Sequence, residues 1–400
     1  MAESAERRNV LVLAICQALY LASASVSVAL SGLVGSMLAP SKALSTLPYS
    51  LSVVATASST VPLSLLMGRL GRRVGFALGA LLGAAGAAIA CAAIFTRDFP
   101  AFCAGNALTG VFQASAQYYR FAAADAADAR FRSRAVSWVL TGGVVAAVLG
   151  PSLASATKDL FMPARFAGSF LAMAAVALAT IPLLMVLRVP APRAVRDPAG
   201  GRPLAAIARQ PGFTTAIANC VIGYTTMIFI MTATPLAAVA HHHSSDRAIG
   251  IIRLHLIGMF LPSFFTGGLI ARYGVAWVML AGATMSLLAA VVSIAGATLV
   301  HFWLALPLLG AGWNFMYVGG TTLLTAVYRP EERAKVQATN EFVTFGLVAL
   351  ASLSSGGVFA RFGWQAVNYA VLPLLVLAAS TTVWYVAAQR RPAPVQPDGL

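Results

Sequence analysis

The stretch GRLGRRVG (68–75) follows one long apolar run, and a related stretch, GGLIARYGV (267–275), follows another. The Arg-x-Gly triplet that begins at Arg69 recurs at Arg272. A single loop of this kind can be an ordinary tight turn that carries positive charge. Two copies in matching positions favour a duplicated unit, and internal repeats are typical of secondary transporters.

The apolar runs around these loops fill most of the chain. Of its 400 residues, 59% are hydrophobic and 10% are charged, whereas an ordinary globular domain has roughly 25% charged residues. A membrane helix needs about 20 predominantly apolar residues. The pattern therefore predicts an all-α membrane protein with twelve transmembrane helices in two six-helix pseudo-repeats. The first run exceeds the apolar core of a signal peptide, so we interpret it as an uncleaved helix. The predicted spans are 10–32, 44–66, 75–95, 100–122, 135–156, 165–187, 212–236, 248–270, 276–298, 302–326, 337–359 and 366–388.

The net charge of +15 reflects 27 Lys and Arg against 12 Asp and Glu. Most of the basic residues fall in loops on one side of the predicted bundle, the side that holds both termini. Because cytoplasmic loops are enriched in Lys and Arg, the sequence predicts that both termini lie in the cytoplasm. Membrane topology accounts for this charge, and we expect no nucleic-acid partner.

One long polar connection, LRVPAPRAVRDPAGGRPLAAIARQPG (187–212), divides the apolar runs into two sets. We expect an N-terminal six-helix half at 1–187, a cytoplasmic linker at 188–211, a C-terminal half at 212–390 and a cytoplasmic tail at 391–400. The sequence has neither a Gly-x-x-x-x-Gly-Lys-Ser/Thr phosphate loop nor a His-Glu-x-x-His motif. The chain is therefore not expected to be an enzyme.

The repeated loops resemble the signature Gly-x-x-x-Asp-Arg-x-Gly-Arg-Arg of the major facilitator superfamily. Arg69, Arg72 and Arg73 match its basic positions, while Gly68 stands where the family has the acid. In the second copy, Ala271 stands at the acidic position. The resemblance implies the major facilitator fold and assigns the three arginines a gating role. In the family, the acid of this loop contributes to holding the two halves together. The resemblance therefore implies that this chain lacks that contribution.

Two predicted neighbouring helices carry soft donor atoms at helical spacing. Met227 and Met231 lie on one helix, and His255 and Met259 lie on the next. Residues four apart share one helical face, and thioether and imidazole ligands suit copper. This pattern predicts a copper site, with Cys220 on the same side of the first helix as a relay. The alternatives are methionines that fill gaps in an apolar core and a histidine that bonds a neighbouring helix.

Two prolines and a histidine run accompany these donors. Pro235 and Pro262 each remove a backbone hydrogen bond, which predicts a freed carbonyl, a hinge or a simple kink beside the site. His241, His242 and His243 lie in the turn between the two helices and form either a capture patch for metal or a solvated loop.

With these motifs, the chain resembles the CcoA-type copper importers of the bacterial inner membrane, which supply copper for the assembly of cbb3-type cytochrome c oxidase. The resemblance implies a monomeric, multi-pass importer in the lipid bilayer that works by alternating access. Copper would be its transported substrate, with no prosthetic group. Copper chaperones or oxidase assembly factors would be its candidate partners.

Two residues are candidates for proton coupling: His255, and Glu341, the one acid that we place within a predicted span. Arg120 is a candidate pairing or gating residue. Two other functions compete with copper import. The stretch GGVVAAVLGP (142–151) partly resembles the superfamily's antiporter motif, which favours proton-coupled efflux of a drug or metabolite. A membrane sensor or chaperone would bind copper without moving it.

Overall fold

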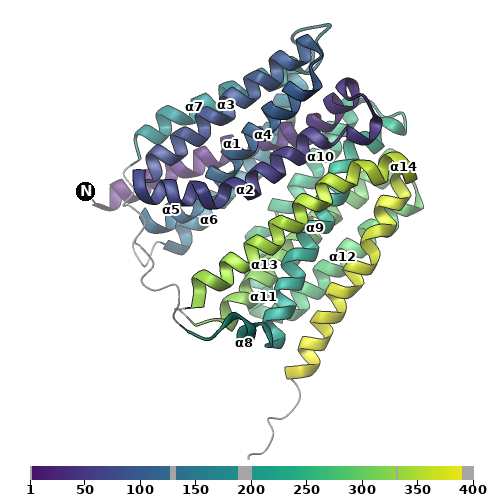
Figure 1. The fold of residues 1–400 in the computed structure, drawn as a ribbon. Coiled ribbons are helices and arrows are strands. Elements are labelled where there is room, and N and C mark those ends of the chain that lie inside the picture. Colours follow the sequence, from purple (N-terminus) through teal and green to yellow (C-terminus); the bar gives the residue numbers. More distant parts are fainter. Residues whose placement is uncertain (1, 127–131, 188–200, 330–331, 390–400) are drawn as a thin grey trace, which may run out of the picture.

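The computed structural model describes residues 2–126, 132–187, 201–329 and 332–389, and the elements in these ranges are all helices (Figure 1). The N-terminal half contains α1 (Ala2–Leu38), the 3-10 turn η1 (Lys42–Leu44), α2 (Leu47–Leu70), α3 (Arg72–Thr96), α4 (Phe99–Ala116), α5 (Tyr119–Ala126), α6 (Arg132–Thr157) and α7 (Ala167–Met185). The C-terminal half contains α8 (Leu204–Ala208), α9 (Pro211–Ala240), α10 (Ser245–Phe260), α11 (Ser263–Tyr273), α12 (Val275–Ala295), α13 (Leu299–Val327) and α14 (Arg333–Gln389).

The twelve predicted spans all fall on these helices, and three details differ. The fourth span breaks into α4 and α5, and the eighth breaks into α10 and α11 at Pro262, which has no N–H to continue the helix. The last two spans form α14, which turns sharply at Gly363, where the backbone φ is 77°. Glycine adopts this conformation without steric cost.

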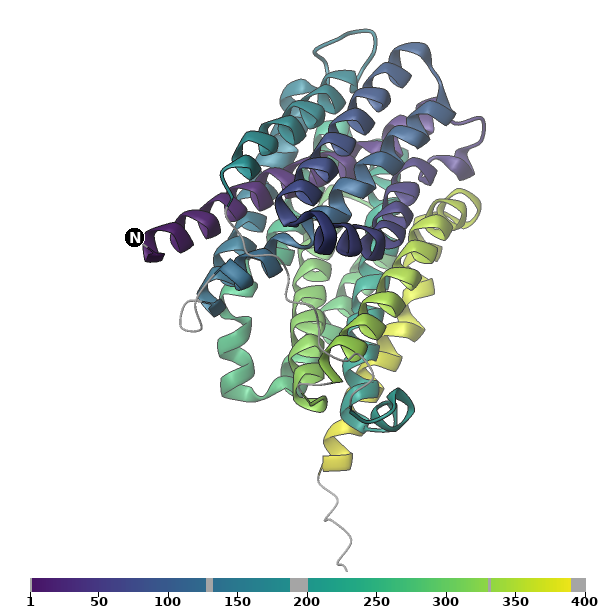
Figure 2. The ribbon, with the colours of Figure 1, turned by 60° about the vertical axis from the view of Figure 1, so that its left-hand side comes forward.

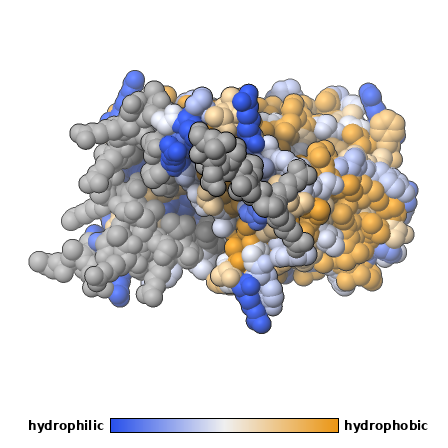
Figure 3. All heavy atoms as spheres, turned by 90° about the horizontal axis from the view of Figure 1, so that it is seen from below, coloured by the Kyte–Doolittle hydropathy of each residue, from blue (hydrophilic) through white to orange (hydrophobic). Residues whose placement is uncertain are grey.

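Length and apolarity make this a multi-pass membrane protein. Nine helical stretches within the described ranges can cross a membrane, and the last of them, Lys335–Gln389, turns at Gly363 and so supplies two crossings. Large hydrophobic side chains such as Phe264, Trp277 and Val300 are more than half exposed. Viewed from below, hydrophobic residues form a broad area on the right of the molecule (Figure 3). These side chains are suited to contact with lipid.

The helices form two groups that meet at one end (Figures 1 and 2). Within each group, small residues allow close backbone contact, as is common between membrane helices. A Cβ atom on Gly105 of α4 would lie 2.6 Å from the carbonyl oxygen of Gly86 on α3. In the other half, a Cβ on Gly258 of α10 would lie 2.5 Å from the carbonyl oxygen of Pro307 on α13.

We name the two ends of the bundle by their loops. The terminus end holds the first turn of α1, the α2–α3 loop and the C-terminal end of α14; the opposite end holds η1, the α9–α10 turn and Gly363. At the opposite end, side chains of the two halves bond directly: Lys158 pairs with Asp246, and the hydroxyls of Ser50 and Ser352 lie 2.9 Å apart. The structure is thus closed at its opposite end.

Candidate substrate-binding site

Four aromatic side chains of the C-terminal half form a continuous cluster within the bundle. Trp313 and Tyr317, one helical turn apart on α13, stack with their rings nearly parallel, 10° between planes and 5.3 Å between centroids. Tyr224 of α9 meets both rings edge-on at 5.4 Å. Phe345 of α14 completes the cluster at 5.8 Å from Tyr224. Three helices therefore contribute to one aromatic wall, made of Tyr224, Trp313, Tyr317 and Phe345.

The N-terminal half brings polar side chains toward this wall. Tyr20 of α1 lies close enough to Tyr224 and to Arg120 of α5 for electrostatic interaction. Arg120 interacts in the same way with Glu341 of α14. The Nε atoms of Arg120 and Trp313 are both buried, and neither has a hydrogen-bond partner within the described chain. Buried donors without partners are costly, and a bound molecule with acceptor atoms would satisfy them.

This combination of aromatic rings and a few polar groups is what small-molecule sites in proteins usually offer. Aromatic rings prefer offset-stacked or edge-to-face neighbours. The stacked face of Trp313 and Tyr317 therefore suits a flat ring system, and the adjacent charged side chains suit polar substituents on that ring.

The three proposed methionine ligands belong to one large buried apolar cluster, which includes residues of both halves. Met227, Met231 and Met259 are 2%, 2% and 7% exposed, and His255 is fully buried. The imidazole Nδ1 of His255 lies 2.8 Å from the carbonyl oxygen of Leu306 on α13, so Nδ1 is the donor. Its Nε2 atom is buried and, among the described residues, has no partner.

The prolines act differently from one another in the structure. Helix α9 continues through Pro235 to Ala240, whereas the chain breaks between α10 and α11 at Pro262. The carbonyl oxygen of Met259, near this break, accepts a hydrogen bond of 2.8 Å from the side chain of Asn314 on α13. The break is therefore tied to α13.

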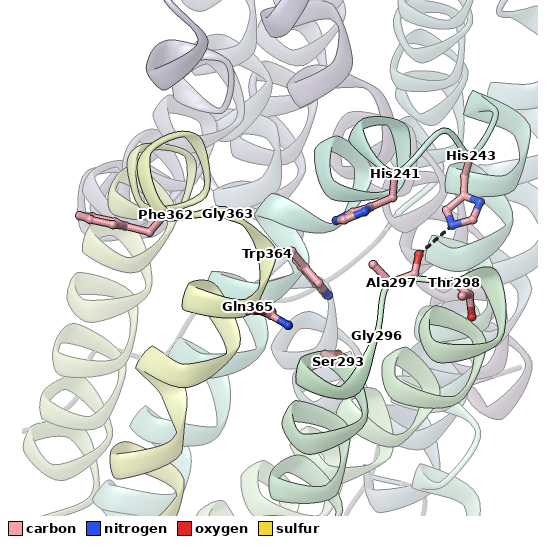
Figure 4. A pocket seen from close by; sticks show the side chains of 10 residues that line it. All are labelled: His241, His243, Ser293, Gly296, Ala297, Thr298, Phe362, Gly363, Trp364 and Gln365. Carbon is pink, nitrogen blue, oxygen red and sulfur yellow. Dashed lines mark hydrogen bonds between the residues drawn. The ribbon is translucent and has the colours of Figure 1, made fainter.

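The remaining predicted metal residues separate into two places. Cys220 is buried against α13, with Sγ 3.9 Å from the carbonyl oxygen of Tyr317, and so borders the aromatic wall. His241 and His243 line a cavity at the opposite end, together with residues of α12, the α12–α13 connection and α14 (Figure 4). His242 does not line it.

Two of the three predicted gating arginines near the α2–α3 loop make hydrogen bonds within their own half. Arg72 donates to the carbonyl oxygen of Tyr118 at 3.5 Å, and Arg73 reaches the sulfur of Met185 at 3.5 Å. Arg69 lies in the last turn of α2, where a basic side chain is favoured by the helix dipole. These contacts do not join the two halves.

Sequence reasoning missed the aromatic wall. A signal was present, because Trp313 and Tyr317 are spaced four residues apart in the middle of an apolar helix. Aromatic belts of membrane proteins instead lie at the helix ends. The partners of this pair, Tyr224 and Phe345, are far away in the sequence and are brought to it only by the fold.

The chain matches the family model of the Major Facilitator Superfamily over residues 13–252 and 215–399, and it belongs to that family. It is 43% identical to the riboflavin transporter RfnT of Brucella anthropi over 378 residues, which cover 94% of each chain. It is 30% identical to the uncharacterized MFS-type transporter YdeG of Bacillus subtilis, over 96% of this chain and 93% of that protein. The chain is therefore a membrane transporter, not an enzyme.

Solved structures show the same fold at low sequence identity. A bacterial homolog of the human lysosomal transporter Spinster, in an inward-facing and occupied conformation, aligns with a TM-score of 0.69 at 16% identity, covering 96% of this chain and 98% of that one. The nucleoside transporter NupG aligns with a TM-score of 0.64 at 15% identity, covering 96% of this chain and 99% of that one.

Proposed function

We propose that this chain transports riboflavin across the bacterial inner membrane by alternating access. The observation that carries the proposal is the aromatic wall, present in a chain that is 43% identical to a riboflavin transporter along nearly its whole length. Riboflavin carries a flat tricyclic ring with carbonyl groups. In the proposed complex, that ring stacks on the aromatic wall at Trp313 and Tyr317, and one of its carbonyl groups accepts a hydrogen bond from the Nε atom of Arg120.

With both termini in the cytoplasm, as the basic loops predict, the closed opposite end faces outward. The structure then represents the state that exchanges substrate with the cytoplasm. Transport requires the contacts at the opposite end to break while the terminus end closes around the loaded site.

Exchange across reconstituted vesicles tests this function without assuming a direction. Vesicles that contain the purified chain are loaded with unlabelled riboflavin, and the entry of labelled riboflavin is measured. We expect exchange by the intact chain. Stacking of a flat base on an aromatic side chain is worth about 1–3 kcal/mol, so Trp313→Ala and Tyr317→Ala should each reduce exchange about 5- to 150-fold.

Phe315→Leu is the matched control, since Phe315 lies on the same helix but packs on Phe265, 6.5 Å away between centroids, outside the wall. It should exchange at the intact rate. Absence of riboflavin exchange by the intact chain would refute the proposal.

We assign proton coupling to Glu341, with Arg120 as its electrostatic partner. An ionisable side chain inside a membrane helix is costly and is usually kept for function. Glu341→Gln should retain riboflavin exchange at equal concentrations and lose accumulation driven by an imposed proton gradient. Retained accumulation would move the coupling role to another residue.

Copper import through Met227, Met231, His255 and Met259 is the second candidate. The observation that favours it is the His255 ring, because a metal-binding histidine typically donates its other ring N–H to a carbonyl, as Nδ1 does here. Labelled copper uptake should then fall in His255→Ala and Met227→Ala but not in Met37→Ala, a methionine that is 58% exposed. Equal uptake in all three would eliminate the copper site at these residues.

A further inference from the structure

A cavity of about 580 Å³ lies at the opposite end of the C-terminal half, away from the aromatic wall. Three segments meet there: the end of α9, the α12–α13 connection and the turn of α14 (Figure 4). None of the wall residues lines it. A volume of this size is ordinary for a site that binds a small organic molecule.

The turn at Gly363 places two aromatic residues at this cavity. Phe362, before the turn, is 70% exposed, and Trp364, after it, is 4% exposed. The indole Nε1 of Trp364 is buried and has no hydrogen-bond partner among the described residues. Since this atom can only donate, the cavity holds an unused donor beside an aromatic surface.

The histidine turn supplies the facing side of the cavity. His242 has a left-handed backbone, with φ of 62°, and this conformation reverses the chain so that His241 and His243 both line the cavity. His243 is fixed, because its Nε2 lies 3.0 Å from the carbonyl oxygen of Ala297. The His241 ring extends from α9 into the same space as the Trp364 indole (Figure 4).

We propose that this cavity is a peripheral binding site for a flat, carbonyl-bearing heteroaromatic ring, the chemical class to which the riboflavin ring belongs. The indole Nε1 of Trp364 donates to a ring carbonyl, and the His241 ring lies against the bound ring. This inference rests on the proposed function for the choice of ligand. Under the predicted topology, the cavity faces outward and would hold substrate that has not yet entered the central site.

Lumichrome, which has the tricyclic ring without the sugar-like chain, is the probe for this cavity. The purified full chain is titrated with lumichrome and the quenching of ligand fluorescence is measured, with Tyr317→Ala present to weaken the central site. Saturable binding should persist in that background. Trp364→Phe keeps an aromatic ring but removes the donor, so affinity should fall about 5- to 10-fold, and His241→Ala should also weaken binding.

Trp303→Phe is the control, because Trp303 lies on α13 outside the cavity and is 47% exposed. It should bind lumichrome with unchanged affinity, and thermal melting of every variant verifies folding. Unchanged affinity in folded Trp364→Phe, or no saturable binding in the Tyr317→Ala background, would overturn the peripheral site. If the intact chain fails to exchange riboflavin while lumichrome binding still depends on Trp364, the proposed function is refuted and the peripheral binding site is supported.

Discussion

The two ends of the bundle are held by different kinds of contact. At the opposite end, the halves are joined by the Lys158–Asp246 ion pair and by the packing of Gly356 on Thr46. At the terminus end, Arg72 and Arg73 bond within the N-terminal half, and a Cβ atom on Gly68 would meet nothing within 4 Å. Among the described residues, these side-chain bonds between the halves lie at the opposite end, so that end contributes to holding the halves in the observed conformation.

The loop signature explains part of this difference. Gly68 and Ala271 occupy the positions where the superfamily has acids. Without a carboxylate at Gly68, the α2–α3 loop has one fewer group with which to reach the other half. Arg72 and Arg73 of this loop instead make hydrogen bonds within the N-terminal half.

Reversal of the charge at Lys158 should have the largest effect on the closed end. Lys158 is 7% exposed and contacts both Asp246 and Asp159, so Lys158→Glu would place three acids together. We expect opening at this end to be favoured by about 2–3 kcal/mol, roughly 30- to 150-fold. Asp246→Lys in the same chain should restore closure.

A cysteine at position 352 reports this change. Ser352 is fully buried between the halves, and the four native cysteines are buried. Ser352→Cys should react with a membrane-impermeant maleimide faster when the opposite end opens. An unchanged labelling rate in Lys158→Glu would show that the ion pair does not hold the end closed.

A pair of neighbouring glycines gives a smaller and more local test. A Cβ atom on Gly356 of α14 would overlap the buried Thr46 side chain of the other half, whereas one on Gly357 would meet nothing within 4 Å. Overpacking typically costs about 1–3 kcal/mol, so Gly356→Ala should raise the labelling rate of the cysteine at position 352 roughly 5- to 150-fold. Gly357→Ala should leave it unchanged, and equal rates in both would contradict the packing argument.

A substitution at the terminus end should change the contact between the halves least, because the Arg202–Glu332 ion pair there lies within one half. Glu332 is buried and accepts two hydrogen bonds of 2.8 Å from the Arg202 side chain. These bonds hold the pKa of Glu332 well below its usual value. The pair therefore stabilises the fold fully above the unfolded carboxyl pKa of about 4.3, and the stabilisation declines as pH falls toward the lower folded pKa.

We expect Glu332→Gln to lower the thermal midpoint at pH 7 without changing the labelling of the cysteine at position 352. The difference in midpoint from the intact chain should persist down to about pH 5 and shrink below about pH 4. A difference that is independent of pH across this window would show that the carboxylate charge of Glu332 does not contribute.

The helices and their order could be predicted from the sequence because each span is an apolar run of sufficient length. The break at Pro262 also follows from local chemistry. The break after Ala116 does not, since neither Gln117 nor Tyr118 prevents a helix from continuing. Breaks of that kind depend on tertiary packing.

The site shows the same limit more clearly. Spacing correctly predicts that Met227 and Met231 share a helix, and the structure places both in one large apolar cluster with Met259. The spacing does not reveal that the imidazole of His255 forms a hydrogen bond with the carbonyl oxygen of Leu306 on α13. The aromatic wall needs three helices to meet, and no local pattern encodes that meeting.

The Arg202–Glu332 pair bears on whether the chain can be cut between its two halves. It fixes the beginning of the C-terminal half to the loop before α14, so this half retains its own anchor when the connection at 188–200 is cut. The intact connection then acts mainly by raising the effective concentration of one half near the other. Two separately expressed fragments, 1–195 and 196–400, should therefore assemble into a working transporter.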